Sequence, residues 1–171
     1  QNFVGLGGFL EGLFGLLVAG ITVWVVRHGE LTVSRFEVAR AGIAANAQKM
    51  GIDVIYFDSE SAIDPSFLEK AGCDIEHVLY VQARSVEFVL ETIEDLLGTN
   101  ENQMLFIWDS LALTPSVSDV EGDFNPLSSM AVKPRILSKG MSKLTVPIAN
   151  SKSTLLVLNQ LKTNITSNIA E

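Results

Sequence analysis

Four short apolar runs, separated by segments with helical spacing, constrain the fold of this chain more than any other feature. Each run is rich in β-branched or aromatic residues, and together they occupy 53–57, 78–81, 104–108 and 154–158. Runs of this length and character predict strands of a parallel sheet that is covered on both faces. Between them, 85–97 has apolar residues at helical spacing. We therefore predict an α/β fold with a mainly parallel sheet flanked by helices.

Proline positions mark two of the expected helices. Asp64 followed by Pro65 is typical of a helix start, because aspartate caps free N–H groups and proline suits the first turn. A further helix is expected over 128–148. Pro134 and Pro147 lie inside that segment, so we predict a kinked or split helix there.

Composition limits the class of protein. The chain has 171 residues, of which 47% are hydrophobic, and this suits one domain with a buried core. One cysteine, Cys73, excludes a disulfide framework and a cysteine-based zinc site. A formal net charge of −8 argues against a protein that coats nucleic acid generally, but it permits a local basic groove. Residues 3–26 carry one charge, Glu11, and we favour buried strands over a membrane anchor there.

Polar side chains follow three of the predicted strands. Glu60 follows the first, Asp109 and Ser110 the third, and Asn159 and Gln160 the fourth. In open parallel sheets, ligands bind beyond the carboxyl ends of the strands, so we expect these side chains at one edge. An aspartate after an apolar strand, as at Asp109, is the arrangement of a Walker B residue that holds the Mg²⁺ of a nucleotide. Glu60 could orient or deprotonate an attacking water. Polar residues are also expected at any exposed strand end.

Three segments together resemble the RecA recombinase family, including its phage UvsX-like branch. They are IYFDSESAIDPSFLEKAGCDI (55–75), MLFIWDSLALTP (104–115) and SKGMSKLTVPIANSKSTLLVLNQLKTNI (138–165). The order, spacing and residue types of the strand-end motifs agree over about 43–165. The resemblance implies a RecA-like P-loop NTPase core that uses ATP and Mg²⁺ and acts in DNA recombination and repair. It also implies a helical filament of identical subunits on single-stranded DNA, in the cytoplasm of a bacterial cell or phage-infected host, with no membrane partner.

The resemblance implies roles for residues around the nucleotide. Glu60 takes the place of the family's catalytic glutamate, which activates water for ATP hydrolysis. Asp109 and Ser110 take the Walker B positions, with Asp109 at the metal. Asp64 and Phe67 fall where the family contacts the adenine, and Phe67 can stack on the base although a tyrosine is common there.

The resemblance also implies a DNA-binding region. Gln160 takes the place of the glutamine that couples the γ-phosphate to the second DNA-binding loop, and 119–125 lies where the family has its first such loop. Other residues expected near DNA are Gly122, Lys133, Arg135, Lys139, Asn159 and Lys162.

The segment that should carry the phosphate-binding loop departs from the family. That loop has the pattern G-x-x-x-x-G-K-[ST], in which backbone N–H groups and the lysine hold the phosphates. Gly20 stands where the first glycine is expected, but the apolar run 21–26 follows it. The nearest later match, GELT at 29–32, places Glu30 where lysine is needed, and a carboxylate there would repel phosphate.

Several explanations stay open at this point. The first is that the segment 19–42 is truly divergent, the second that it results from an insertion or frame shift, and the third that Arg27 replaces the lysine; we favour the first two. We therefore divide the chain into a divergent or disrupted P-loop region, 1–42, and a well-matched core fragment, 43–171, truncated in the second DNA loop. The functional alternatives are a catalytically dead RecA-like interaction module, a related hexameric helicase-type ATPase, and a membrane-associated protein anchored by 3–26.

Overall fold

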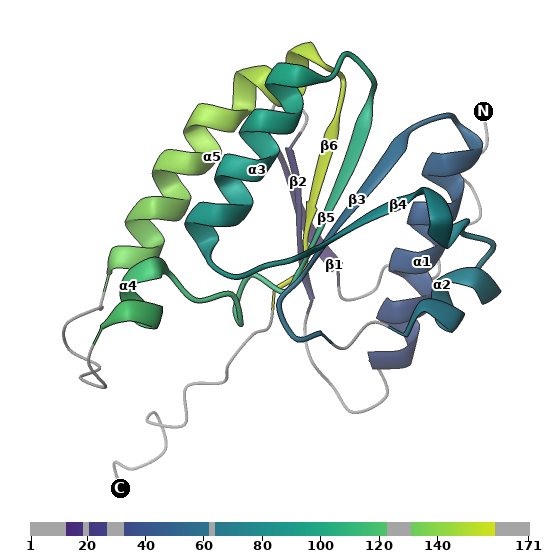
Figure 1. Ribbon diagram of the computed structural model, residues 1–171, viewed down its shortest axis with the longest axis horizontal. Helices are drawn as coiled ribbons and strands as arrows, with labels where there is room; N and C mark the ends of the chain where they lie inside the picture. The colour runs from purple at the N-terminus through teal and green to yellow at the C-terminus, as the bar shows by residue number, and fades with distance from the viewer. Residues whose placement is uncertain (1–12, 19–20, 27–32, 62–63, 123–130, 160–171) are drawn as a thin grey trace, which may run out of the picture.

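A six-stranded sheet forms the centre of the molecule, as the computed structural model shows (Figure 1). The residues that the structure describes are 13–18, 21–26, 33–61, 64–122 and 131–159, and only the main chain is described before Val38. The strand order is β1-β2-β6-β5-β3-β4. The strands are β1 (Leu13–Val18), β2 (Ile21–Val26), β3 (Asp53–Asp58), β4 (Val78–Gln82), β5 (Met104–Asp109) and β6 (Thr154–Val157).

The directions of the strands place their ends. β1 pairs antiparallel with β2, whereas the pairs β2–β6, β6–β5, β5–β3 and β3–β4 are all parallel. The carboxyl ends of these five parallel strands therefore meet at one edge, the lower edge in Figure 1. The four apolar runs are confirmed as strands β3 to β6, and the ends of β3, β5 and β6 are neighbours as expected.

Helices cover both faces of the sheet, which confirms the α/β fold class. In Figure 1, α3 and α5 lie together on one face, while α1 and α2 lie on the other. The helices are α1 (Val33–Lys49), α2 (Pro65–Lys70), the 3₁₀ turn η1 (Ile75–His77), α3 (Val86–Thr99), α4 (Val117–Glu121) and α5 (Val132–Asn150).

Alternation along the strands builds two cores, one on each face. In β3, Ile55 and Phe57 pack toward α3 and α5, whereas Val54 and Tyr56 pack toward α1 and α2. Trp108 in β5 is fully buried on the α3–α5 side. Because successive side chains of a strand point to opposite faces, the residue after Trp108 points to the α1 side.

Two expectations about helices have different outcomes. Asp64 caps α2 as predicted, because its Oδ1 accepts a hydrogen bond of 2.9 Å from the backbone N–H of Ser66. The last helix is not split, because α5 runs without a break from Val132 to Asn150 although Pro147 lies inside it; the kink stays a prediction. Pro134 lies in the first turn, where a backbone N–H would have no helical partner, so it costs no hydrogen bond.

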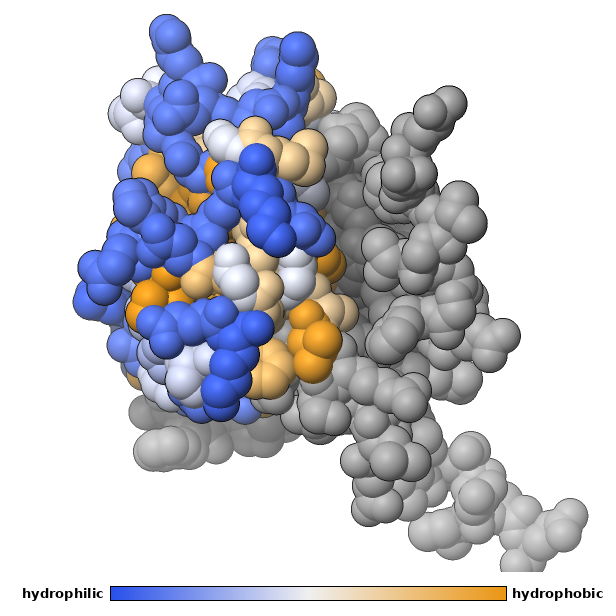
Figure 2. Space-filling model, turned by 90° about the vertical axis from the view of Figure 1, so that its right-hand side faces the viewer, coloured by the Kyte–Doolittle hydropathy of each residue, from blue (hydrophilic) through white to orange (hydrophobic). Residues whose placement is uncertain are grey.

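Strand β4 is less buried than its sequence predicts. Leu79 and Tyr80 are 50% and 49% exposed. The reason is its position: β4 lies at the end of the sheet, so it has one neighbour and incomplete cover from helices. Figure 2 views the side of the molecule on which α1 and α2 lie, and its coloured part is mostly hydrophilic with separate hydrophobic spots.

The first two strands determine which strand precedes α1, where a phosphate-binding loop would be expected. The strand that leads into α1 is β2. It is parallel to β6, whereas β1 is antiparallel to β2. Gly20 lies between these two strands, outside the described residues, as does the connection 27–32 into α1. β1 and β2 confirm that the apolar segment forms strands, whereas the burial of their side chains stays a prediction. Within the described ranges, no helix is long and apolar enough to cross a membrane.

Candidate functional site

The end of β3 is shaped by one buried carboxylate, Asp58. Its side chain is only 2% exposed. Oδ1 accepts hydrogen bonds from the backbone N–H groups of Glu60, at 2.8 Å, and Ser61, at 3.0 Å, and Oδ2 accepts one from the Tyr80 hydroxyl at 2.8 Å. Asp58 therefore holds the turn of the chain after β3 and fixes the main chain of Glu60. Glu60 itself is exposed.

The Tyr80 hydroxyl is a persistent donor to this carboxylate. Burial raises the pKa of Tyr80 to about 12, and the hydrogen bond and the negative charge of Asp58 add to that shift. Both effects disfavour a phenolate beside a carboxylate. At neutral pH the phenol is protonated and donates to Asp58.

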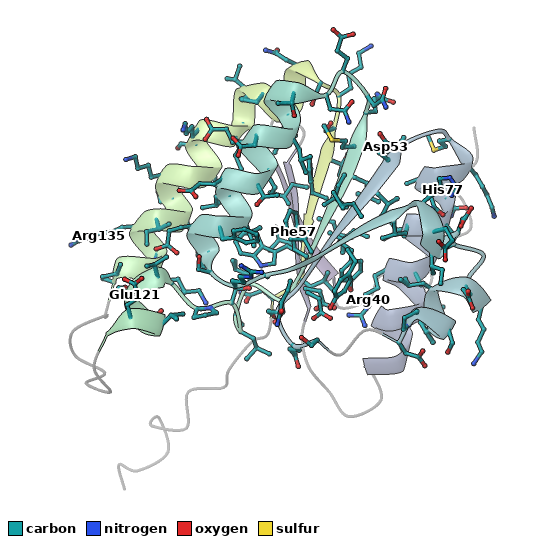
Figure 3. The ribbon with its side chains drawn as sticks, in the orientation of Figure 1. Arg40, Asp53, Phe57, His77, Glu121 and Arg135 are labelled. Atoms are coloured by element: carbon teal, nitrogen blue, oxygen red, sulfur yellow. The ribbon has the colours of Figure 1, made fainter. Side chains whose placement is uncertain are left out.

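The end of β5 holds a carboxylate of a different kind. Oδ2 of Asp109 accepts a hydrogen bond of 2.9 Å from the Tyr56 hydroxyl and forms an ion pair with Nη1 of Arg40. The side chains of Arg40 and Asp109 are 17% and 16% exposed. Figure 3 shows Arg40 reaching from α1 toward the carboxyl ends of the strands. A charged pair thus occupies the α1 side of this edge.

Ser59 joins the two strand ends. Asp58 and Asp109 are direct neighbours in the β3–β5 register. The backbone N–H of Ser59 donates to the carbonyl oxygen of Asp109 at 2.8 Å, and its Oγ accepts from the N–H of Ser110 at 2.9 Å. The position of the main chain before Glu60 is therefore coupled to that of Asp109.

Ser110 lies in a tightly bonded turn after β5. Its carbonyl oxygen accepts from Thr114 Oγ1 at 2.9 Å, and that hydroxyl in turn accepts from the indole N–H of Trp108 at 2.8 Å. The peptide bond between Asp109 and Ser110 is cis. Ser110 Oγ is buried and has no hydrogen-bond partner among the described residues. The hydroxyl of Ser110 is therefore enclosed by the turn.

Among the described residues, Asp109 is a single carboxylate without a preformed set of metal ligands around it. In the part of the chain that the structure describes, no three Asp, Glu, His or Cys side chains are grouped so as to hold a metal ion. Oδ2 of Asp109 already has Arg40 as its partner. A divalent cation at the same oxygen would meet a like charge at close range.

The residues expected near the adenine lie on α2. Asp64 is exposed and caps that helix, and its hydrogen bonds from Ser66 lower the pKa of the carboxyl. Phe67 is partly buried against the core beneath α1 and α2. Their contact with a base stays a prediction.

Some of the residues expected near DNA form contacts within the chain, whereas others are exposed. Nζ of Lys133 donates to the carbonyl oxygens of Leu111 and Ala112, at 2.8 and 3.0 Å, which ties α5 to the turn after β5. Arg135 and Lys139 are exposed on α5, and Figure 3 shows Arg135 pointing away from the molecule.

Gly122 has a structural reason to be glycine. It ends α4, and a Cβ at this position would lie 2.5 Å from the carbonyl oxygen of Ser118. Asn159 is partly buried just after β6. Gln160 and Lys162 lie outside the described residues.

Sequence reasoning did not find the partners of the two aspartates. Tyr56 had a signal, because strand alternation and the neighbouring strand place it on the same face as Asp109. No sequence pattern points to Arg40 as a partner of Asp109, because the two residues are 69 positions apart in the chain. Tyr80 lies on a separate strand, and only the sheet order brings it to Asp58.

Comparison with known proteins gives a consistent result. The family model described as the RecA N-terminal domain matches residues 28–169. Protein RecA of Leptospira meyeri is 30% identical over 162 residues, covering 95% of this chain and 38% of that protein. Protein RecA of Streptomyces ambofaciens is 32% identical over 121 residues, covering 71% and 32%, and that of a Nocardioides species is 32% identical over 162 residues, covering 95% and 43%. The chain spans roughly two fifths or less of the length of these relatives.

Proposed function

The chain belongs to the RecA family, and from this membership we propose that it supplies the nucleotide-binding and DNA-binding core of a protein that acts in DNA recombination and repair. In this proposal the core binds ATP at the carboxyl edge of the sheet and single-stranded DNA through its loops. Identical subunits assemble along the DNA as a helical filament. The work would take place in the cytoplasm of a bacterial cell or a phage-infected host.

One observation carries the nucleotide part of the proposal. Glu60 and Asp109 follow neighbouring parallel strands, and Ser59 bonds those two strand ends together. Ligands of open parallel sheets bind at such an edge. The hydrogen-bonded arrangement supports a single nucleotide site that includes both strand ends.

Glu60 is proposed as the general base. Its carboxylate is exposed, while Asp58 holds its backbone N–H at 2.8 Å. In the proposed step, Glu60 takes a proton from a water whose oxygen forms a bond to the γ-phosphorus. The bond from that phosphorus to the β–γ bridging oxygen breaks, giving ADP and phosphate. Gln160 is proposed to sense the γ-phosphate, and Asp64 and Phe67 to contact the adenine.

The DNA part of the proposal relies on local charge. The chain as a whole is acidic, so attraction to phosphate must come from particular cations. Arg135 and Lys139 are exposed on α5, whereas Lys143 pairs with Glu94 at 2.7 Å. We expect Arg135→Ala to weaken binding of single-stranded DNA and to lower its salt dependence, and Lys143→Ala to have a smaller effect. Fluorescence anisotropy with a labelled oligonucleotide at several salt concentrations measures both.

The test of the nucleotide proposal separates binding from hydrolysis. A fluorescent ATP analogue is titrated into the 171-residue chain, and phosphate release is followed with and without single-stranded DNA. We expect saturable binding, and we expect Glu60→Gln to retain it while losing hydrolysis by about a hundredfold or more. Glu91→Gln changes an exposed glutamate on α3 and serves as the matched control. If the unmodified chain does not bind the analogue, the nucleotide proposal is wrong.

A further inference from the structure

The charge of Asp109 is already balanced by the chain itself. The guanidinium of Arg40 pairs with Oδ2, the same oxygen that accepts a hydrogen bond of 2.9 Å from Tyr56. Both members of the pair are more than four fifths buried, at 17% and 16% exposure. Little water reaches this contact, so screening between the charges is weaker than on an open surface.

Arg40 is well placed to remain at this carboxylate. It lies within α1, which packs through Ala41, Ala44 and Ala45 onto the sheet, so its backbone position is set by the core. A guanidinium is always protonated and presents several donors in a fixed plane. Removing it from the pair would leave a largely buried carboxylate without its cation, which is unfavourable.

A divalent cation at Asp109 therefore faces a competitor. To bind Oδ2 it must either displace the guanidinium or lie within a few ångströms of it, and like charges at that distance repel strongly. In the absence of nucleotide phosphates, the described residues near Asp109 offer no group of three acidic, histidine or cysteine ligands that would offset this repulsion.

We propose that Arg40 is the resident counter-cation of Asp109, and that it excludes divalent metal ions from this carboxylate. Asp109 is held by Arg40 and Tyr56 as a fixed part of the nucleotide edge. This inference rests on the proposed function for the identity of the edge as a nucleotide site. The pairing of Arg40 with Asp109 rests on the geometry alone.

The experiment measures Mn²⁺ binding to the chain without nucleotide, by electron paramagnetic resonance of the free ion. Arg40→Gln removes the cation and keeps a side chain that can donate a hydrogen bond. Arg84→Gln is the control: it removes the same charge near the same edge, where Arg84 is exposed and lies over Phe88 at 5.7 Å. We expect Arg40→Gln to bind Mn²⁺ about tenfold or more tightly than the unmodified chain, and Arg84→Gln to change little.

A second change assigns the site. Adding Asp109→Asn to Arg40→Gln should return Mn²⁺ binding to the weak level of the unmodified chain. The inference is overturned if Arg40→Gln binds Mn²⁺ no more tightly than the unmodified chain does, or if the tighter binding survives loss of Asp109. Circular dichroism confirms that each variant is folded.

A measurement on the unmodified chain covers the case in which Arg40→Gln fails to fold. The guanidinium resonance of Arg40, assigned by nuclear magnetic resonance, should stay unchanged when Mg²⁺ is added in excess. Movement of that resonance, with saturation, would overturn the inference. Neither readout uses nucleotide. A failure to bind the ATP analogue would therefore contradict the proposed function without affecting the test of the Arg40–Asp109 pair.

Discussion

The ends of β3 and β5 have similar local sequences but different hydrogen-bond partners. Each strand ends in an aromatic residue followed by Asp-Ser, as Phe57-Asp58-Ser59 and Trp108-Asp109-Ser110. Asp58 accepts hydrogen bonds from two backbone N–H groups and a phenol, all of them neutral donors. Asp109 accepts from a phenol and a guanidinium. One carboxylate shapes a loop, and the other balances a buried positive charge.

The difference shows that the residues of a strand-end motif do not determine which charged or neutral groups contact its aspartate. Both aspartates lie in register on the same sheet. What differs is the third element: strand β4 supplies Tyr80 to Asp58, while helix α1 supplies Arg40 to Asp109. The following changes test this contrast.

The largest effect is expected at Asp58. Asp58→Ala leaves three donors without their acceptor, and we expect the free energy of unfolding to fall by about 3 kcal/mol. Asp58→Asn keeps an acceptor oxygen and should lose clearly less. Urea denaturation followed by tryptophan fluorescence measures both. Equal losses for the two variants would show that the negative charge, rather than the acceptor, holds this loop.

The next effect is the coupling between Arg40 and Asp109. In a double-mutant cycle of Arg40→Ala and Asp109→Ala, we expect a coupling energy of about 1–2 kcal/mol, because the two charges are in direct contact and largely shielded from water. The same denaturation assay gives the four values required. A coupling near zero would mean that the pair is no more than a weak surface contact, and the contrast between the two strand ends would be lost.

A pH-dependent effect is expected at Tyr80 and serves as a probe of the β3 end. Its pKa in the folded chain is raised from 10.0 to about 12. The stabilising contribution is therefore complete below pH 10 and is lost as the pH rises from 10 toward 12. Because the chain has two tyrosines, Tyr56→Phe leaves Tyr80 as the only phenol, and its ionisation can be followed by ultraviolet absorbance. Titration near pH 10 in the folded variant would contradict the contact with Asp58.

The smallest effect is expected at Gln82. Its amide donates to Ser61 Oγ at 3.2 Å on an exposed surface beside the Glu60 loop. Gln82→Ala should change the free energy of unfolding by no more than about 0.5 kcal/mol, because water can replace an exposed hydrogen bond. A loss as large as that of Asp58→Ala would show that the loop depends on its outer contacts and not on the buried carboxylate.

Local patterns were sufficient for much of the fold. Apolar runs of four or five residues predict β3, β4, β5 and β6, and Asp64 before Pro65 predicts the start of α2. These predictions are confirmed because the residue patterns of a buried strand and of a helix cap are short and continuous in the chain. The predicted split of α5 is wrong: Pro134 falls in the first turn, where it costs no hydrogen bond, and the helix also continues through Pro147.

The candidate site was predicted only in outline. The sequence places Glu60 and Asp109 at neighbouring strand ends, and the sheet order confirms that placement. It gives no sign of Arg40 at Asp109. The roles of Glu60 in hydrolysis, of Phe67 at the base and of Arg135 at DNA stay predictions.

The amino-acid sequence by itself determined the α/β class, the family and the edge at which chemistry should occur. Those properties follow from periodicity, strand-end residues and motif order, all of which are local or linear in the chain. Only the tertiary structure decided which partner each aspartate has. Asp58 and Asp109 follow equivalent strands, but partners come from elements that are far apart in sequence and meet only when α1 packs on one face and β4 closes one end of the sheet.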